Sequence, residues 1–292
     1  MSFRTIVITK HSKLSYKNRY MYVRNEEYEK YIHLSEIDTL IIDSVSSSIT
    51  TNLLKELSDN KINIIFCDEK HNPFGQLDSY YSRHNTSKKL LLQSKWTRTI
   101  KALMWTFIIK NKISNQKLLL KKLHNAKYKL LQEYEKEVLI GDKTNREGHS
   151  AKVYFNSLYG NNFTRNMDSS INSALNYGYA VLLSTFSKEI ISNGYLTQIG
   201  IHHKNEFNQY NLSCDLMEPF RIIIDNYVYF NCDKEFDSDY KMNLVNLFNQ
   251  KYKYNKKLYT LKDIIKLYTK SIFDNIENNK LDEYKGFYIY EE

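Results

Sequence analysis

The 292-residue sequence has few of the residues that break regular structure or cross-link a chain: two prolines, eight glycines and three cysteines. The cysteines, Cys67, Cys214 and Cys232, show no CxxC spacing, and their odd number leaves one unpaired. This usage indicates free thiols in a reducing compartment and no zinc site. No apolar run approaches the length of a membrane span, and residues 1–9 lack a signal-peptide core. We therefore expect a cytoplasmic protein that does not associate with membranes.

Common nucleotide-binding and hydrolase motifs are also missing. The sequence contains no P-loop, no GxGxxG fingerprint and no G-x-S-x-G nucleophile elbow. The adjacent histidines His202 and His203 are not part of an H-E-x-x-H zinc motif. Nucleotide hydrolysis, dinucleotide binding and acyl transfer therefore have no support in the sequence.

Acidic residues are absent from one long segment, residues 79–132, which contains 13 lysines and arginines. Residues 1–78 carry 10 basic and 11 acidic side chains, and residues 133–292 carry 19 and 22, so this segment holds the whole excess behind the net charge of +9. Uncompensated positive charges repel one another, and a bound polyanion relieves that repulsion with a salt-dependent affinity. The segment predicts a DNA- or RNA-binding surface, and a basic helix face that contacts only solvent is the alternative.

The hydrophobic pattern changes period along the chain and predicts an α+β fold. Short β-branched and aromatic runs predict strands at 3–9, 20–23, 39–43 and 62–67, with a helix at 50–58 and a turn at 72–75. From residue 87 the spacing is helical, with later helices expected at 114–139, 168–193, 213–230, 237–250 and 261–278. Residues 279–292 have no predicted element. We expect a β-rich domain at 1–82 and a larger, all-α domain at 83–292.

The stretch 196–221 carries the densest group of candidate ligands. It contains His202 and His203 in a polar loop, followed by a predicted helix with Asp215 and Glu218. Residues three apart share a helix face, so the two acids project together. Histidine and carboxylates that converge from a loop and a helix can hold a hard divalent cation. Two solvated acids at the start of a helix are the alternative.

Two further residues bear on this interpretation. Pro219 is compatible with a helix in the first turn, where its missing N–H is harmless. Glu147 falls in the first turn of another expected helix, where the helix dipole alone would favour a carboxylate. Neither residue by itself distinguishes a cation site from ordinary helix starts.

Four ordered motifs resemble those of one family. They are Glu147-Gly148-His149-Ser150-Ala151-Lys152-Val153-Tyr154-Phe155, Asp168-x-x-x-Asn172-x-x-Leu175-Asn176-Tyr177-Gly178-Tyr179, Gly200-Ile201-His202-His203 and Asp215-Leu216-Met217-Glu218-Pro219-Phe220-Arg221. In order and spacing they resemble the CRISPR-associated spacer-acquisition integrase, most closely its members from type II systems. The resemblance covers nearly the whole chain, and four motifs in order are far more specific than any one of them.

The resemblance implies an architecture and partners. It implies a small N-terminal β-sandwich-like domain and a larger helical catalytic domain in a homodimer, with two such dimers flanking a dimer of the second CRISPR adaptation protein. The expected location is the prokaryotic cytoplasm. Double-stranded DNA, as prespacer and as CRISPR repeat with its leader, is the implied substrate. Other type II adaptation proteins and the RNA-guided effector nuclease are further candidate partners.

The resemblance also implies roles for individual residues. A Glu, a His and an Asp or Glu bind Mg²⁺ or Mn²⁺ in the family, and these catalytic and metal-binding roles carry over to Glu147, His203 and Glu218. The family histidine stands fifteen residues before the second acid, which selects His203 and leaves His202 a structural role. Some members have Asp where this chain has Glu218. Asp215 would orient His203, with a helix N-cap as its alternative role.

The implied reaction is a transesterification without a protein nucleophile. The 3′-hydroxyl of prespacer DNA attacks a phosphodiester at the edge of the CRISPR repeat, and the metal ion polarises the scissile phosphate. Duplex contacts are expected from seven basic residues, namely Lys88, Arg98, Lys101, Arg146, Lys152, Arg165 and Arg221. Arg221 could instead pair with Asp225, one helical turn later.

Two other functions use the same residues. A metal-dependent endonuclease on branched DNA would employ the same three ligands with water as the attacking group. A non-catalytic DNA-binding scaffold would use the acids only to cap helices. The product distinguishes the first two, and replacement of Glu147 separates both from the scaffold.

Overall fold

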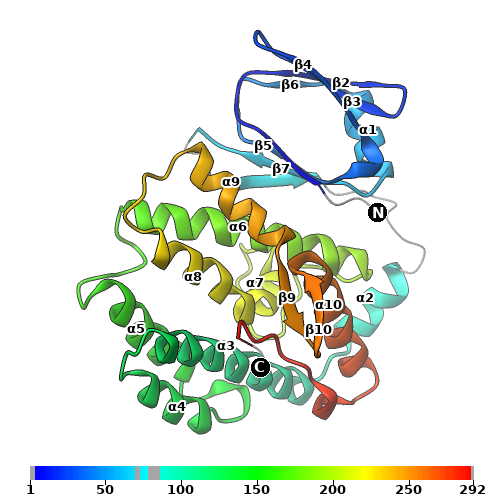
Figure 1. Cartoon of the computed structure of the whole chain (residues 1–292). Coiled ribbons are helices and arrows are strands. Elements are labelled where there is room, and N and C mark those ends of the chain that lie inside the picture. The colour runs from blue at the N-terminus through cyan, green and yellow to red at the C-terminus, as the bar shows by residue number, and fades with distance from the viewer. Residues whose placement is uncertain (1–3, 70–72, 78–85, 291–292) are drawn as a thin grey trace.

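The computed structural model describes residues 4–69, 73–77 and 86–290, which form a β-rich N-terminal part above a larger helical part (Figure 1). This arrangement confirms the predicted fold class. The predicted domain boundary between residues 82 and 83 lies outside the described residues. Within those residues, no helix has the length and apolar character needed to cross a bilayer.

Two four-stranded sheets make up the N-terminal part. One has the order β1-β5-β7-β8, and its strands are β1 (Arg4–Ile8), β5 (Ile37–Ile42), β7 (Asn63–Cys67) and β8 (Pro73–Leu77). The other has the order β4-β3-β2-β6, with β4 (Glu29–His33), β3 (Tyr20–Arg24), β2 (Lys13–Lys17) and β6 (Ser48–Ile49). Between β6 and β7 the chain forms helix α1 (Thr51–Asp59), capped by the side chain of Thr50, which accepts from Leu53 N.

Strand β5 is apolar on both faces because each face meets a different core. Leu40 and Ile42 belong to the core of the N-terminal part, whereas Ile41 belongs to the core of the helical part. Strand β7 alternates in the same way, with Ile64 in the first core and Ile65 in the second. The sheet thus joins the two parts of the molecule, and Figure 1 shows helices α9 (Ser238–Asn246) and α6 (Ser170–Ser192) beneath it.

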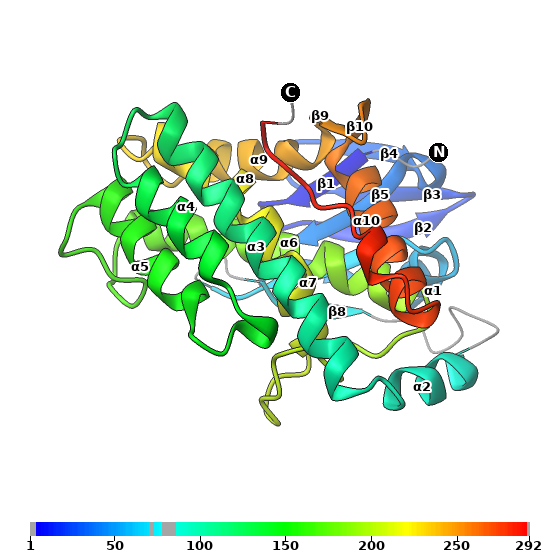
Figure 2. The same cartoon turned by 90° about the horizontal axis from the view of Figure 1, so that it is seen from below.

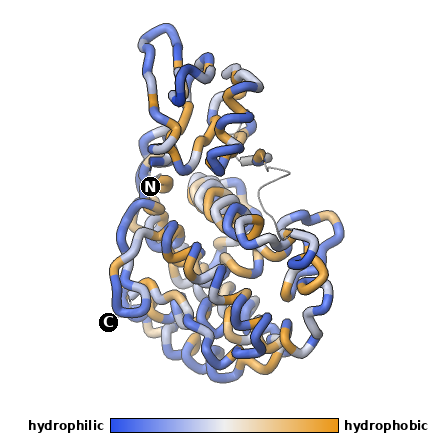
Figure 3. The backbone as a smooth tube through the Cα atoms, turned by 90° about the vertical axis from the view of Figure 1, so that its right-hand side faces the viewer, coloured by the Kyte–Doolittle hydropathy of each residue, from blue (hydrophilic) through white to orange (hydrophobic). Residues whose placement is uncertain are grey.

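The helical part is organised around α3 and α6. Helix α3 spans Arg98–Lys122. Besides α3, α6 and α9, the described helical part contains α2 (Thr86–Ser94), α4 (Tyr128–Glu137), α5 (Arg146–Tyr159), α7 (Asn211–Met217), the 3-10 turn η3 (Glu218–Phe220), α8 (Arg221–Phe230), β9 (Lys251–Tyr254), β10 (Lys257–Thr260) and α10 (Leu261–Glu277), with short 3-10 turns between some of them. Figure 2 shows α3 crossing in front of α6 and α7, with α4 and α5 to one side. Hydrophobic and hydrophilic segments alternate along the chain in both parts (Figure 3).

Several predicted elements were wrong in extent. The helix predicted at 114–139 is two helices, because α3 runs to Lys122 and the chain then turns at His124, whose φ is 54°. The helix predicted at 213–230 is divided by η3, where Pro219 cannot supply a backbone N–H. Of the predicted turn at 72–75, Asn72 lies outside the described residues, and Pro73 begins an edge strand, where a proline is tolerated.

Four strands of the N-terminal part and the hairpin β9–β10 had no predicted counterpart. Strands β2 and β4 carry exposed lysines and glutamate, so apolar residues are few. The hairpin packs against α10, and it corrects the expectation of an all-α second domain. In these strands the pairing partners, more than intrinsic preference, determine the backbone conformation.

Asparagine side chains of α3 hold the segment that follows α10. Asn111 Nδ2 donates to the carbonyl of Phe287 at 2.8 Å, and the N–H of Phe287 donates back to Asn111 Oδ1 at 3.0 Å. Asn115 Nδ2 donates to the carbonyls of Phe287 at 2.8 Å and Pro219 at 2.9 Å, and its Oδ1 accepts from Ile289 N at 3.0 Å. Asn115 of α3 therefore links the segment after α10 to η3, because its side chain bonds to both.

The contact between α6 and α8 depends on Gly178. A Cβ at this position would lie 2.4 Å from Ile224 Cγ2 on α8. We expect Gly178→Ala to destabilise the protein by about 1–3 kcal/mol through overpacking, although alanine favours a helix by about 1 kcal/mol. Chemical denaturation of the single and double variants checks this, because Gly178→Ala should cost less in an Ile224→Ala background. An equal cost in both backgrounds would contradict the contact.

Candidate active site

Glu147 begins helix α5 at a point where neighbouring side chains already satisfy the backbone. The Asp142 carboxylate accepts from the N–H groups of Arg146 at 2.8 Å and Glu147 at 3.0 Å. Asn145, with φ of 52°, accepts from Gly148 N at 3.2 Å through its side chain. These caps leave the Glu147 carboxylate available to ligands other than its own helix.

Glu218 is buried between two cations. Its Oε1 accepts from Arg221 Nε at 3.0 Å, and its Oε2 lies 2.5 Å from Lys112 Nζ on α3. Burial alone would raise the pKa of Glu218, but Arg221 and Lys112 outweigh burial and lower that pKa to about 2. Only 4% of Glu218 is exposed, so it is a buried carboxylate in its charged form.

Lys112 connects the two glutamates. Its Nζ donates to Glu147 Oε1 at 2.7 Å, and so one ammonium bridges both carboxylates. Burial lowers the pKa of Lys112, but the attraction of Glu147 and Glu218 outweighs it and the pKa lies above its ordinary value. Two acids that are 71 residues apart in sequence therefore converge on a single cation.

His203 is held by a buried carboxylate. Its Nδ1 lies 2.6 Å from Asp215 Oδ1, and Asp215 also accepts the N–H groups of Ile201, His202 and His203 at 2.6, 2.9 and 3.1 Å. Asp215 is fully buried, whereas 39% of the His203 side chain is exposed. The other histidine, His202, stacks on Trp105 with ring centroids 4.3 Å apart and an interplanar angle of 5°.

The Asp215 contact raises the pKa of His203, chiefly through their hydrogen bond. A raised folded pKa contributes stability that is fully present below the unfolded value of about 6.5 and is lost as pH rises through the folded value. We expect Asp215→Asn to lower the pKa of His203 in metal-free protein, as measured by NMR titration of the imidazole. Asp239→Asn, at an exposed position of α9, is the control, and an unchanged His203 pKa in Asp215→Asn would contradict the assignment.

A cavity of about 200 Å³ opens beside the two glutamates. Its lining includes Lys112, Glu147 and Glu218 but not His203. Buried Asp225 lies at its wall and accepts hydrogen bonds from Tyr154 at 3.2 Å and from Tyr179. Burial raises the pKa of Asp225 to about 6, against the opposing effects of Tyr179 and Arg221. Arg221 thus pairs with Glu218, and Asp225 is held by tyrosines.

The seven basic residues predicted to contact DNA fall into two groups. Lys88, Arg98 and Lys152 are exposed. The other four already have protein partners, which are the carbonyl of Gly200 for Lys101, Glu137 for Arg146, Asn172 and Asn176 for Arg165, and Glu218 for Arg221. Arg165 and Arg221 also line the cavity.

The acid-free segment is partly compensated by carboxylates from elsewhere in the chain. Lys89 pairs with Glu277 at 2.7 Å, Lys117 pairs with Glu135 at 2.6 Å, and Lys112 pairs with both glutamates. The interpretation of this segment as wholly uncompensated was therefore wrong for these three lysines. Charge counts along a sequence do not register pairs that form only in the tertiary structure.

Sequence reasoning missed Lys112, Asp142 and the buried environment of Asp225. One signal for Lys112 was available, because it stands four residues after Ile108 and three after Ile109 on a buried stripe of α3. A lysine at such a position is almost never fully buried unless it is paired. The partner acids could not be named from that spacing.

Glu147, Glu218 and His203 carry side chains of the type that binds a hard divalent cation, but the ammonium of Lys112 lies between the two glutamates. Two carboxylates and an imidazole are oxygen and nitrogen ligands of the kind that Mg²⁺ and Mn²⁺ accept. Among residues 4–69, 73–77 and 86–290, no three His, Cys, Asp or Glu side chains are grouped closely enough to hold a metal ion. Glu147 and Glu218 nevertheless already share one cation, the Lys112 ammonium. Displacement of that ammonium would free the oxygens of both glutamates for another cation.

The fold is that of the CAS1 proteins and the casposases. A casposase bound to integration product superposes with a TM-score of 0.80 at 19% identity, over 100% of this chain and 95% of that chain. A CAS1 protein from Thermotoga maritima superposes with a TM-score of 0.74 at 15% identity, over 99% and 100% of the two chains.

Sequence comparison identifies the family. A family model described as CRISPR associated protein Cas1 matches residues 5–243. The CRISPR-associated endonuclease Cas1 of Neisseria meningitidis serogroup C (strain 8013) is 34% identical over 226 residues, which span 77% of this chain and 74% of that protein. An endonuclease Cas1 of Francisella tularensis subsp. novicida (strain U112) is 26% identical over 228 residues, 70% and 71% of the two chains. The chain belongs to the Cas1 family.

Proposed function

We propose that this protein is a metal-dependent DNA endonuclease and integrase of CRISPR adaptation, which joins the 3′-hydroxyl ends of prespacer DNA to the CRISPR repeat. The observation that carries the proposal is the convergence of Glu147 and Glu218 on one cation. The family membership and the endonuclease names of relatives support it. The site we propose consists of Glu147, Glu218 and His203, with Mg²⁺ or Mn²⁺ as the cofactor.

Each residue has a distinct part in this proposal. Glu147 and Glu218 supply the carboxylate oxygens, and Asp215 fixes the ring of His203 so that Nε2 is its free ligand atom. When bound, the metal ion supplies Lewis-acid stabilisation of the attacking and leaving oxygens of the phosphodiester. Arg165 and Arg221, at the cavity wall, are placed to neutralise phosphate oxygens. The attacking group is the DNA 3′-hydroxyl, so no protein side chain becomes covalently attached.

The proposed substrates and partners follow from the same assignment. Exposed Lys88, Arg98 and Lys152 would contact the duplex backbone, which positions DNA without reading its sequence. The casposase with this fold was solved with integration product, and another protein of this fold belongs to a Cas6-RT-Cas1–Cas2 complex. We propose that this chain acts in the cytoplasm as a homodimer together with a Cas2-type partner.

A joining assay tests the proposal. The protein and its Cas2-type partner are incubated with a short 3′-hydroxyl duplex, a supercoiled plasmid that carries a repeat, and Mg²⁺ or Mn²⁺. Covalent joining at the repeat boundary by the wild type, and none by His203→Ala, is the expected result. Cutting without joining would favour an endonuclease, and binding without either reaction would leave only a DNA-binding scaffold.

A further inference from the structure

The ammonium of Lys112 occupies the space between the two carboxylates that we assign to the metal. It lies 2.7 Å from Glu147 Oε1 and 2.5 Å from Glu218 Oε2, and only 8% of the residue is exposed. The α3 backbone beneath it is fixed, because Trp105, Ile108 and Ile109 on the same helix are buried in the main core. Exchange of the cation at this position therefore calls for movement of the lysine side chain and not of the α3 backbone.

The two facing carboxylates favour a cation between them. Two carboxylates that face one another without a counter-ion repel, and a buried unpaired carboxylate is strongly disfavoured. Lysine supplies a point charge on a flexible four-carbon stem. The adjacent cavity of about 200 Å³ gives that stem room to turn away.

The second cation on Glu218 is held much more firmly. Arg221 contacts Glu218 Oε1 through both Nε and a terminal nitrogen, each at 3.0 Å, and its guanidinium lies 4.6 Å from the centre of the Tyr179 ring. A planar guanidinium fixed by two nitrogens and an aromatic ring is pre-organised, unlike an ammonium on a flexible stem. Lys112 is thus the exchangeable cation of the pair.

We propose that Lys112 is an internal counter-ion that holds the place between Glu147 and Glu218 in the metal-free protein, and that a divalent cation binds there by displacing its ammonium. The inference rests on the proposed function, in which these two glutamates bind metal. It makes Lys112 a competitor of the metal ion: the lysine stabilises the metal-free site and weakens the metal affinity.

The test compares Mn²⁺ binding by wild-type protein and by Lys112→Met, measured by calorimetry at fixed pH and ionic strength. Methionine has a similar unbranched shape without the charge, so the variant should bind Mn²⁺ roughly tenfold more tightly, a change of about 1.4 kcal/mol. Its melting temperature should be lower than that of the wild type without metal and should recover when Mn²⁺ is added. Lys117→Met is the matched control, because Lys117 lies on the same helix and pairs with Glu135 instead.

A second variant covers the case in which Lys112→Met does not fold. Lys112→Gln also lacks the charge but can donate hydrogen bonds to a carboxylate, and it should bind Mn²⁺ more tightly as well. Suppose that the wild type binds Mn²⁺ and Glu147→Gln does not. If the neutral Lys112 variants then bind Mn²⁺ no more tightly than the wild type, Lys112 does not compete with the metal ion and the proposal is overturned. Failure of wild-type and neutral variants alike to bind Mn²⁺ would instead overturn the metal site, and with it the proposed function.

Discussion

Glu147→Gln will reduce the joining of 3′-hydroxyl DNA to a repeat-bearing plasmid by more than about 100-fold, because loss of even an outer partner of a metal site typically costs 10–100-fold. The substitution keeps the shape of the side chain and removes the charge that balances Lys112. The N–H groups at the start of α5 stay capped by Asp142 and Asn145, so the helix itself should be preserved. Gel analysis of the joined product measures the effect.

The same preparation must still bind DNA for this result to indicate catalysis. Binding of Glu147→Gln to the short duplex, followed by fluorescence anisotropy, is expected to remain within about twofold of the wild type, because phosphate contacts by basic residues dominate such affinity. Glu133→Gln, at an exposed position on α4, is the control for joining. Undiminished joining by Glu147→Gln would reject Glu147 as a ligand that the reaction requires and would leave its carboxylate only the ion pair with Lys112.

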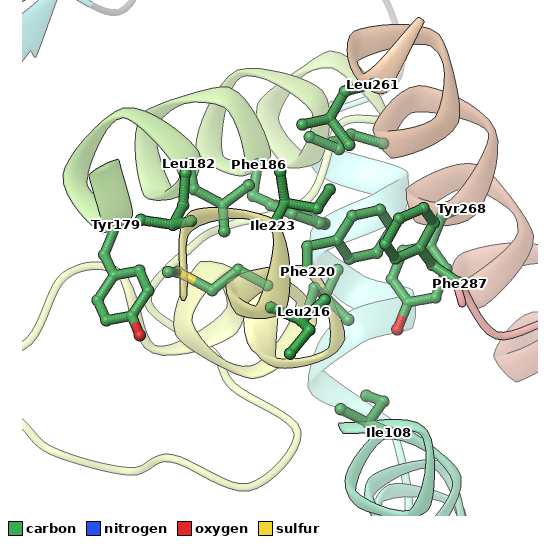
Figure 4. Close-up of a cluster of buried hydrophobic side chains, with 14 of the residues drawn as sticks. Ile108, Tyr179, Leu182, Phe186, Leu216, Phe220, Ile223, Leu261, Tyr268 and Phe287 are labelled. Atoms are coloured by element: carbon green, nitrogen blue, oxygen red, sulfur yellow. The ribbon is translucent and has the colours of Figure 1, made fainter. Parts of the chain in front are cut away.

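Phe220→Ala is expected to cost about 3–5 kcal/mol of stability, the range for truncating a buried aromatic side chain. Phe220 is fully buried at the end of η3 and stacks on Phe287 with ring centroids 4.5 Å apart. It also meets Tyr268 and Phe186 edge-on, at 4.9 and 5.2 Å. Figure 4 shows these rings gathered between α6, α10 and the segment that carries Phe287.

The loss should be visible as a lower midpoint of denaturant unfolding. Phe230→Ala, at a position 53% exposed at the end of α8, provides the comparison and should change stability by less than about 0.5 kcal/mol. Because Phe220 lies between Glu218 and Arg221 in η3 and α8, the variant should also bind Mn²⁺ more weakly under the proposed function. A stability loss below 1 kcal/mol would mean that the surrounding rings collapse into the space.

The outline of the fold could be predicted from the sequence because hydrophobic period is a local property. The run at 39–43 and the long helix around Gly178 both follow from such patterns. The edge strands β2 and β4 could not be predicted, since their lysines and glutamate face solvent and their backbone conformation comes from pairing with β3. The helix end at Lys122 and the break at Pro219 each depend on a single residue. A hydrophobic period is judged over a window of many residues, so it does not register them.

Some residues of the candidate site could likewise be predicted from the sequence, and others could not. Glu147, His203, Asp215 and Glu218 could be selected because they stand in recognisable motifs, and the structure brings Asp215 to His203 and the two glutamates to one lysine. Lys112 belongs to none of those motifs. Its importance arises from the packing of α3 against α5 and η3, which no spacing within the sequence expresses.

The asparagine contacts that brace η3 bear on how the protein is made. Ribosomes synthesise chains from the N-terminus, and parts of a chain begin to fold as they emerge. Glu147, His203 and Glu218 are all translated before Phe287 and Ile289, whose backbone groups pair with Asn111 and Asn115. A nascent chain that already contains every proposed ligand therefore still lacks the segment after α10 that hydrogen-bonds to the asparagines of α3. The hydrogen bonds from α3 to Phe287 and Ile289 form only after translation has passed Ile289.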